Sequence, residues 1–181
     1  MDPAFPDREV TLRDGRAAHL RPVRRSDEDE LLQAFERLDP EARFMRFMRV
    51  VREANVDRLR QTLASFPANG IGIVATVPAA DGIDIVGTAL LIIGNDPTSG
   101  EFAITVAADH GGAGLGQALL SALIDAAQRR GLAEIEGFVL AVNRPMLRLA
   151  ARLGFTVSPD PEDRQVAICR LRLADAAHAS A

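Results

Sequence analysis

The chain has 181 residues, 48% of them hydrophobic and 25% charged, with a formal net charge of −4; this is the size and composition of one globular domain. The longest apolar run, residues 85–94, is about half as long as a membrane span requires, and the single cysteine excludes an internal disulfide, so we expect a cytoplasmic protein without membrane contact. All 21 basic residues are arginine, which excludes a Walker P-loop and lysine Schiff-base chemistry, and the negative charge argues against broad nucleic-acid binding.

A hairpin and three helices are expected first along the chain. Residues 10–12 and 16–23 have strand patterns on either side of an Asp-Gly turn. A helix is predicted from a capping-box-like start at Ser26 and Asp29, and a second begins at Asp39, an N-cap followed by a proline. A short third helix covers residues 56–66.

A cluster of arginines falls in this helical segment. Only Glu53 and Asp57 oppose its six members, which are Arg43, Arg46, Arg49, Arg52, Arg58 and Arg60. Their spacing of three drifts around a helix and forms no clean stripe, so we interpret them as a solvated surface. Docking of an anionic partner is the alternative.

The second part of the chain changes to strand patterns around one long helix. Strands rich in valine, isoleucine and threonine are predicted at 70–77, 83–93 and 101–107, then a helix at 114–130, a strand at 133–142, a helix at 145–153, and strands at 155–157 and 165–173. The fold class is therefore mixed α/β, a mostly antiparallel twisted sheet with flanking helices. We expect one domain over 9–173, an N-terminal tail over 1–8 and a frayed tail over 174–181. A strand–helix–strand crossover near 101–142 is where a site is expected.

Residues 111–116, Gly-Gly-Ala-Gly-Leu-Gly, lie directly between a predicted strand and a predicted helix. Glycines let the backbone approach a ligand and turn its N–H groups toward it, and the helix N-terminus adds partial positive charge. This pattern favours a phosphate or diphosphate site; a tight turn is the alternative reading. A dinucleotide fingerprint is not matched, because Gln117 or Leu119 occupies its last position.

The loop and its flanks resemble the acyl-CoA loop of the GNAT superfamily of N-acyltransferases. The usual pattern there is Gln/Arg-x-x-Gly-x-Gly/Ala, and here Ile104-Thr-Val106 precedes the loop. Asn143-Arg-Pro-Met146 with Leu153-Gly154-Phe155 resembles the next motif of that family. Segments 10–14, 20–22, 43–47 and 101–106 resemble the acetyltransferase domain of bacterial Pat-type protein lysine acetyltransferases. The resemblance extends over residues 8–173.

The resemblance implies a GNAT-like fold that uses acetyl-CoA as co-substrate and no metal. Its acyl-CoA site would consist of Ile104, Thr105, Val106, Gly111, Gly112, Ala113, Gly114, Leu115, Gly116, Gln117, Asn143 and Met146. The strand residues would pair with the pantetheine arm and the loop amides would hold the diphosphate. Gly111 and Ala113 stand where the family often has polar or basic residues, so we expect weaker affinity. Ala150 stands where many members have a tyrosine that protonates the leaving thiolate.

The general base implied by the resemblance is Glu101, at the start of the strand that would hold the pantetheine. A solvated strand-end carboxylate is the alternative reading. Glu134 and Glu136 on the next strand are a secondary choice for assistance. His110 is interpreted as a solvent-exposed loop residue, and Cys169 as a small core residue.

These observations predict an N-acetyltransferase that moves acetyl from acetyl-CoA directly to an amine, with a protein lysine as the acceptor suggested by the Pat-type resemblance. The alternatives are a small-molecule amine acetyltransferase and a catalytically degenerate module that binds acyl-CoA as a sensor or docks a partner. The resemblance also allows a homodimer, since homodimers are common in this superfamily.

Overall fold

The structure, a computed structural model, describes residues 5–173, and within them eight strands form one sheet. The strands are β1 (Arg8–Thr11), β2 (Ala17–Pro22), β3 (Gly70–Ala79), β4 (Gly82–Ile93), β5 (Ser99–Val106), β6 (Glu134–Leu140), β7 (Thr156–Pro159) and β8 (Val166–Arg172). The α-helices are α1 (Glu28–Arg37), α2 (Pro40–Phe47), α3 (Val56–Ser65), α4 (Leu115–Arg129) and α5 (Arg144–Arg152). Two short 3-10 helices are η1 (Arg25–Asp27) and η2 (Ala108–His110). The predicted mixed α/β fold class is confirmed.

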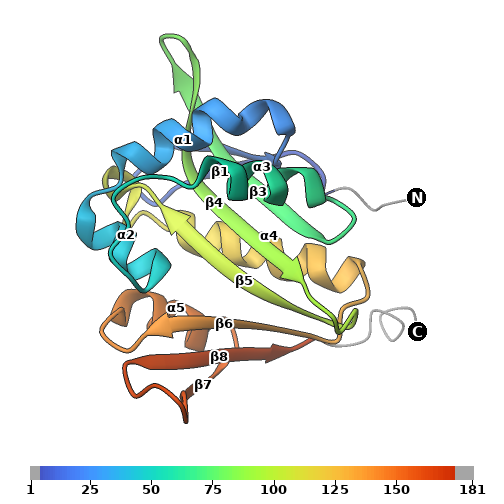
Figure 1. The fold of residues 1–181 in the computed structure, drawn as a ribbon. Helices are drawn as coiled ribbons and strands as arrows, with labels where there is room; N and C mark the ends of the chain where they lie inside the picture. The colour runs from blue at the N-terminus through green and yellow to red at the C-terminus, as the bar shows by residue number, and fades with distance from the viewer. Residues whose placement is uncertain (1–4, 174–181) are drawn as a thin grey trace.

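The sheet has the order β1-β2-β3-β4-β5-β6-β8-β7. Every neighbouring pair is antiparallel except β5 and β6, which are parallel. This pair arises because the chain leaves β5, passes through α4 and returns as β6, so the predicted crossover is confirmed. Figure 1 shows α1, α2 and α3 on one face of the sheet and α4 on the opposite face.

Helix α4 forms the centre of the core and packs against β3, β4 and β5. Its buried residues are Leu115, Leu119, Leu120, Ala122, Leu123, Ala126 and Ala127. They recur every three or four positions, so one face of the helix is apolar and lies on the sheet. Full burial of each leucine contributes roughly 2 kcal/mol. This packing fixes the N-terminus of α4 beside the end of β5.

The start of α1 differs from the capping expected at Ser26 and Asp29. Asp27 takes that place: its carboxylate accepts the backbone N–H of Arg24 at 2.7 Å and pairs with the Arg21 guanidinium at 2.7 and 2.8 Å. Arg21 comes from β2, so the carboxylate that accepts this local hydrogen bond is also held by a tertiary ion pair. The expected cap of α2 is confirmed, because Asp39 accepts the N–H of Ala42 at 2.7 Å.

The described chain already contributes to the fold before residue 9. Arg8 opens β1, and the Phe5 side chain is buried in the core. The division into one domain and two tails stays a prediction, and the tail over 174–181 lies outside the described residues. Within residues 5–173, no helix combines the length and the hydropathy that crossing a membrane demands.

Candidate active site

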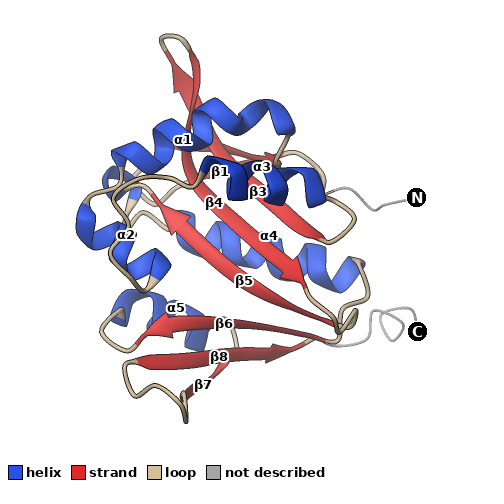
Figure 2. Cartoon of the chain, in the orientation of Figure 1, coloured by secondary structure: helices blue, strands red, loops and turns tan. Residues whose placement is uncertain are grey.

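Strands β5 and β6 pair over three residues and then separate. Residues 99–101 pair with residues 134–136, whereas the rest of β5 pairs only with β4 and the rest of β6 only with β8 within the described chain. Figures 1 and 2 show the two strands diverging from this point toward α2 and α5. The backbones of β5 and β6 therefore diverge as a wedge in the middle of the sheet, and this unpaired region is called the opening below.

An aromatic side chain fills the point where the strands separate. Phe102 is the first residue beyond the shared segment, and a Cβ atom at Gly137 on β6 would lie only 2.6 Å from its ring. The same ring packs edge-on against Phe155, with centroids 5.2 Å apart. A side chain at position 137 would collide with this ring, so the glycine permits the arrangement that accompanies the split.

The β5 edge that faces the opening carries unpaired backbone groups. The N–H of Ala107 donates to the Val86 carbonyl on the β4 side at 2.9 Å. Antiparallel partners alternate between hydrogen-bonded and non-hydrogen-bonded pairs, so Thr105 directs its N–H and C=O toward β4. Ile104 and Val106 direct theirs toward β6, where the ladder has ended. An extended ligand can add to this edge as a strand does.

The glycine loop presents a second row of free donors. Among the hydrogen bonds of residues 5–173, none is donated by the six consecutive amides of residues 112–117. Gly112 and Gly114 have positive φ values of 72° and 91°, a backbone conformation that favours glycine. Gly114 is also the N-cap of α4, so the amides lie at the positive end of the helix dipole. These are the features of an anion site.

The loop, the β5 edge and the start of α5 line one cavity of about 380 Å³. Ten of the twelve residues predicted for the acyl-CoA site line this cavity: Ile104, Thr105, Val106, Gly111, Gly112, Gly114, Gly116, Gln117, Asn143 and Met146. The other two, Ala113 and Leu115, are buried in the core and do not line the cavity. Leu38, Ala42 and Met45 from the α1–α2 segment complete the wall.

Asn143 and its neighbours on α5 are placed by a helix cap. The Asn143 side-chain oxygen accepts the N–H of Met146 at 3.3 Å, which leaves its amide nitrogen for a ligand. Met146 packs partly on the core and partly on the cavity. Ala150 is fully buried in the core, so the position of the usual tyrosine is filled by packing.

The three glutamates on β5 and β6 have different surroundings. Glu134 and Glu136 form ion pairs with Arg170 of β8, at 3.2 and 2.9 Å. Glu101 is exposed, lies beside Glu136 in the sheet register, and forms no ion pair within 4.0 Å with the described residues. It is the last β5 residue of the ladder, at the base of the opening. Of the three, Glu101 has the carboxylate most available to take a proton.

Arg46 lines the cavity, so its interpretation as part of a solvated surface is wrong. Its Nε donates to Thr105 Oγ1 at 3.1 Å, and it lines the cavity. Burial lowers the pKa of the Arg46 guanidinium, and the nearby Glu101 carboxylate acts in the opposite direction. Arg46 remains a cation and brings positive charge to the Glu101 side of the site.

Two further interpretations are tested by burial. His110 was expected in solvent, but only 6% of it is exposed, and its Nδ1 lies 2.9 Å from Asp109 Oδ1. The reason is that η2 turns the residue inward before the glycine loop. Cys169 is fully buried, which confirms it as a core residue.

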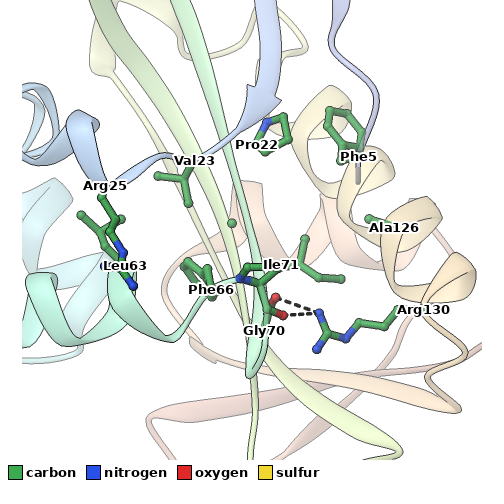
Figure 3. Close-up of a pocket in the computed structure, with 12 residues that line it drawn as sticks. Phe5, Pro22, Val23, Arg25, Leu63, Phe66, Gly70, Ile71, Ala126 and Arg130 are labelled. Atoms are coloured by element: carbon green, nitrogen blue, oxygen red, sulfur yellow. Dashed lines mark hydrogen bonds between the residues drawn. The ribbon is translucent and has the colours of Figure 1, made fainter. Parts of the chain in front are cut away.

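A second cavity, of about 210 Å³, lies between the start of β3 and α4 (Figure 3). Unlike the first cavity, it is not lined by the glycine loop or by the unpaired edge of β5. Its walls are mostly apolar, and the Arg130 guanidinium beside it donates to the carbonyls of Pro67, Ala68 and Gly70. That arginine fastens a loop to α4. Among residues 5–173, no group of three or more histidine, cysteine, aspartate or glutamate side chains is arranged to hold a metal ion.

Comparison with known proteins gives consistent matches. The family model of the acetyltransferase (GNAT) domain matches residues 18–156. Acetyltransferase PA5475 of Pseudomonas aeruginosa is 33% identical over 163 residues, which cover 90% of this chain and 88% of that protein.

Solved structures share the fold. The GNAT domain of S. lividans PAT superposes with a TM-score of 0.83 at 22% identity, covering 92% of this chain and 97% of that one. The yncA protein of Salmonella typhimurium, solved with its cofactor acetyl-CoA, gives a TM-score of 0.68 at 23% identity over 90% of this chain and 97% of that one.

Proposed function

Because this chain belongs to the GNAT acetyltransferase family, we propose that it moves the acetyl group of acetyl-CoA directly to an amine, with Glu101 as general base. One observation carries the proposal: two rows of unpaired backbone groups meet in one cavity. They are the amides of residues 112–117 and the β5 edge at Ile104 and Val106. A single ligand with a diphosphate and an amide-bearing arm satisfies both rows.

The residues present fit acetyl-CoA. The amides of residues 112–117 would hold its diphosphate, the β5 edge would pair with its pantetheine amides, and Asn143 and Met146 would flank the arm. When bound, acetyl-CoA supplies the activated acetyl thioester. Val106 and Glu101 are five residues apart, about 17 Å along a strand. An arm anchored at the loop and extended along β5 therefore points toward Glu101.

Glu101 removes the obstacle to this reaction, which is that an alkylamine keeps its proton near neutral pH. Its carboxylate takes that proton, directly or through a water molecule. The amine nitrogen then bonds to the thioester carbonyl carbon as the carbon–sulfur bond breaks. The Ile104 N–H, which faces the opening, polarises the carbonyl. The leaving thiolate takes its proton from water, because the buried Ala150 offers no hydroxyl.

We propose a protein lysine as the acceptor. The support is the Pat-type resemblance of segments 43–47 and 101–106, together with the charge beside the cavity. Arg49 and Arg52 follow α2, whose residues line the cavity, and both are exposed. They suit a lysine flanked by acidic residues. A small amine is the alternative acceptor.

The binding step is tested by calorimetric titration with acetyl-CoA, with NAD and AMP as comparators. We expect micromolar binding that is at least tenfold weaker in Gly114→Glu, because the variant adds bulk and negative charge at the amides. Gly131→Glu is the matched control: its φ of 80° imposes the same backbone strain at the opposite end of α4. No binding at millimolar acetyl-CoA would contradict the proposed function.

The acceptor is tested by measuring CoA release with a lysine peptide bearing acidic flanks, the same peptide with neutral flanks, and a polyamine. The proposal expects the acidic peptide to be the best of the three. A faster reaction with the polyamine would favour the small-amine alternative. Tight binding of acetyl-CoA with no release of CoA in the presence of any acceptor would favour a module that binds acyl-CoA without catalysis.

A further inference from the structure

The glycine loop that would hold the diphosphate has no basic side chain of its own. The loop over residues 111–117 is Gly-Gly-Ala-Gly-Leu-Gly-Gln, and the first basic residue of α4 is Arg129 in its last turn. Free amides and a helix dipole of about half a unit charge are all that this segment offers. A diphosphate carries more negative charge than that, so the segment alone leaves it incompletely compensated.

The turn of the β1–β2 hairpin is fastened to this loop from the other end of the chain. The N–H of Arg13 donates to the Ala113 carbonyl at 2.9 Å. The Arg13 Nη2 donates to Gln117 Oε1 at 3.1 Å, across 104 residues of sequence. Arg16 Nη2 adds a third bond, to the Asp109 carbonyl at 2.8 Å. The turn is therefore held against the start of α4.

The Arg13 side chain lies along the row of free amides. A Cβ atom at Gly114 would be 3.5 Å from Arg13 Nε and 3.7 Å from its Cγ. Arg13 also lines the 380 Å³ cavity. Arg46 and Arg152 are the other arginines of that wall, but no hydrogen bond of the described residues connects either to the glycine loop.

The charge of Arg13 is available, whereas that of its neighbour is not. Arg16 forms an ion pair with Asp14 at 2.6 Å. Arg13 forms no ion pair within 4.0 Å with the acidic residues of the described chain, and its one side-chain partner is the neutral Gln117. A guanidinium held in this way presents its remaining N–H groups in the planar geometry that suits phosphate oxygens.

We propose that Arg13 is the cationic residue that binds the diphosphate of acetyl-CoA, in place of the basic side chains that the loop itself lacks at Gly111 and Ala113. The inference rests on the proposed function. The β1–β2 hairpin is then part of the binding site, because its turn places the positive charge of Arg13 beside a loop that has no charged residue. Gln117 positions the guanidinium and leaves its charge uncompensated.

The test compares Arg13→Met with Arg16→Met, two variants of the same turn that each remove one guanidinium. Arg13→Met loses the bond to Gln117, whereas Arg16→Met loses the bonds to the Asp109 carbonyl and to Asp14. Calorimetric titration with acetyl-CoA should give a dissociation constant about tenfold to a hundredfold higher in Arg13→Met, since charge-assisted hydrogen bonds are lost. Arg16→Met should stay within about threefold of wild type, and Arg13→Lys should recover part of the affinity.

A second readout separates diphosphate binding from a general effect on the fold. S-acetylpantetheine lacks the diphosphate and the nucleotide, so kcat/KM for this shortened donor should be the same in Arg13→Met and wild type. The inference would be overturned if Arg13→Met and Arg16→Met lost the same acetyl-CoA affinity. It would also be overturned if Arg13→Met lowered kcat/KM for the shortened donor as much as it lowered the affinity for acetyl-CoA. If Arg13→Met bound acetyl-CoA as tightly as wild type, the role of Arg13 would be overturned and the proposed function would stay intact. A wild-type chain that binds no acetyl-CoA would remove both.

Discussion

Glu101 and Glu136 are neighbours in the sheet, yet their carboxylates meet different partners. Glu136 lies 2.9 Å from the Arg170 guanidinium, so its charge is already compensated. Glu101 is the last β5 residue of the β5–β6 ladder and lies close enough to Arg46 to interact with its charge. A carboxylate without a direct partner is better able to accept a proton from an incoming amine.

Replacing Glu101 by glutamine therefore tests the base. We expect Glu101→Gln to lower kcat for CoA release at least tenfold, because an amide cannot accept the proton. The dissociation constant for acetyl-CoA should stay within a few-fold, since Glu101 does not line the cavity. Glu136→Gln is the control and should keep most of the activity. Equal turnover in Glu101→Gln and wild type would remove Glu101 from the mechanism.

Residues such as Arg13 and Arg46 mark the limit of prediction from sequence. The glycine loop could be found because four glycines in six residues are a local signal, and Asn143 because its motif is local. Arg46 reaches Thr105 across 59 residues and Arg13 reaches Gln117 across 104. Nothing in the spacing around either arginine shows such a partner, because it depends on how distant elements pack.

Among the helices and strands, the predicted boundaries were most accurate where the burial of one face enforces a regular pattern. The alternating strands and the apolar face of α4 correspond to the observed elements within a few residues, because burial of one face enforces the period. The start of α1 was not predicted because Ser26 and Asp29 fit a local rule, whereas Asp27 of η1 is held by Arg21 of β2. The separation of β5 from β6 could not be predicted either, because it involves the packing of Phe102 over Gly137, which is distant in the sequence.

The Arg21–Asp27 pair joins β2 to the start of α1, and Asp27→Asn tests its contribution. Breaking a buried ion pair by removing one charge costs about 3 kcal/mol, so the variant should lose roughly that much free energy of unfolding in urea at pH 7. Asp14→Asn breaks an exposed pair with Arg16 and should leave the free energy of unfolding little changed. A similar effect of the two substitutions would contradict a special role for the buried pair.

The same pair gives a pH dependence whose sign follows from Asp27. Burial raises the pKa of its carboxyl, but the hydrogen bonds from Arg21 and Arg24 outweigh burial, and the folded pKa lies below the ordinary 3.8. A group with a lowered folded pKa stabilises the protein above its unfolded pKa, and this contribution is lost as the pH falls through the folded value. The stability difference between wild type and Asp27→Asn should therefore be constant above about pH 5 and shrink below pH 4.

At the scale of the whole molecule, the single cysteine reports on how the sheet opens. Cys169 lies in β8 between Gly137 of β6 and Val157 of β7, and it is fully buried. Burial raises the pKa of its thiol to about 11. A thiol reagent attacks the thiolate, so reaction requires both access and ionisation. Opening of the sheet around β8 supplies both at once.

We expect Cys169 to be labelled in the native protein at least a thousandfold more slowly than in the urea-unfolded chain, because only a small unfolded fraction exposes it. Mass spectrometry after pulses of iodoacetamide at increasing urea should give a labelling midpoint equal to that of the circular dichroism transition. β7 is an exposed edge strand of four residues, so it is the place where separate opening would begin. Labelling well below the dichroism transition would show that β7 and β8 open independently, and that the half of the sheet beyond the split is not one cooperative unit with β1–β5.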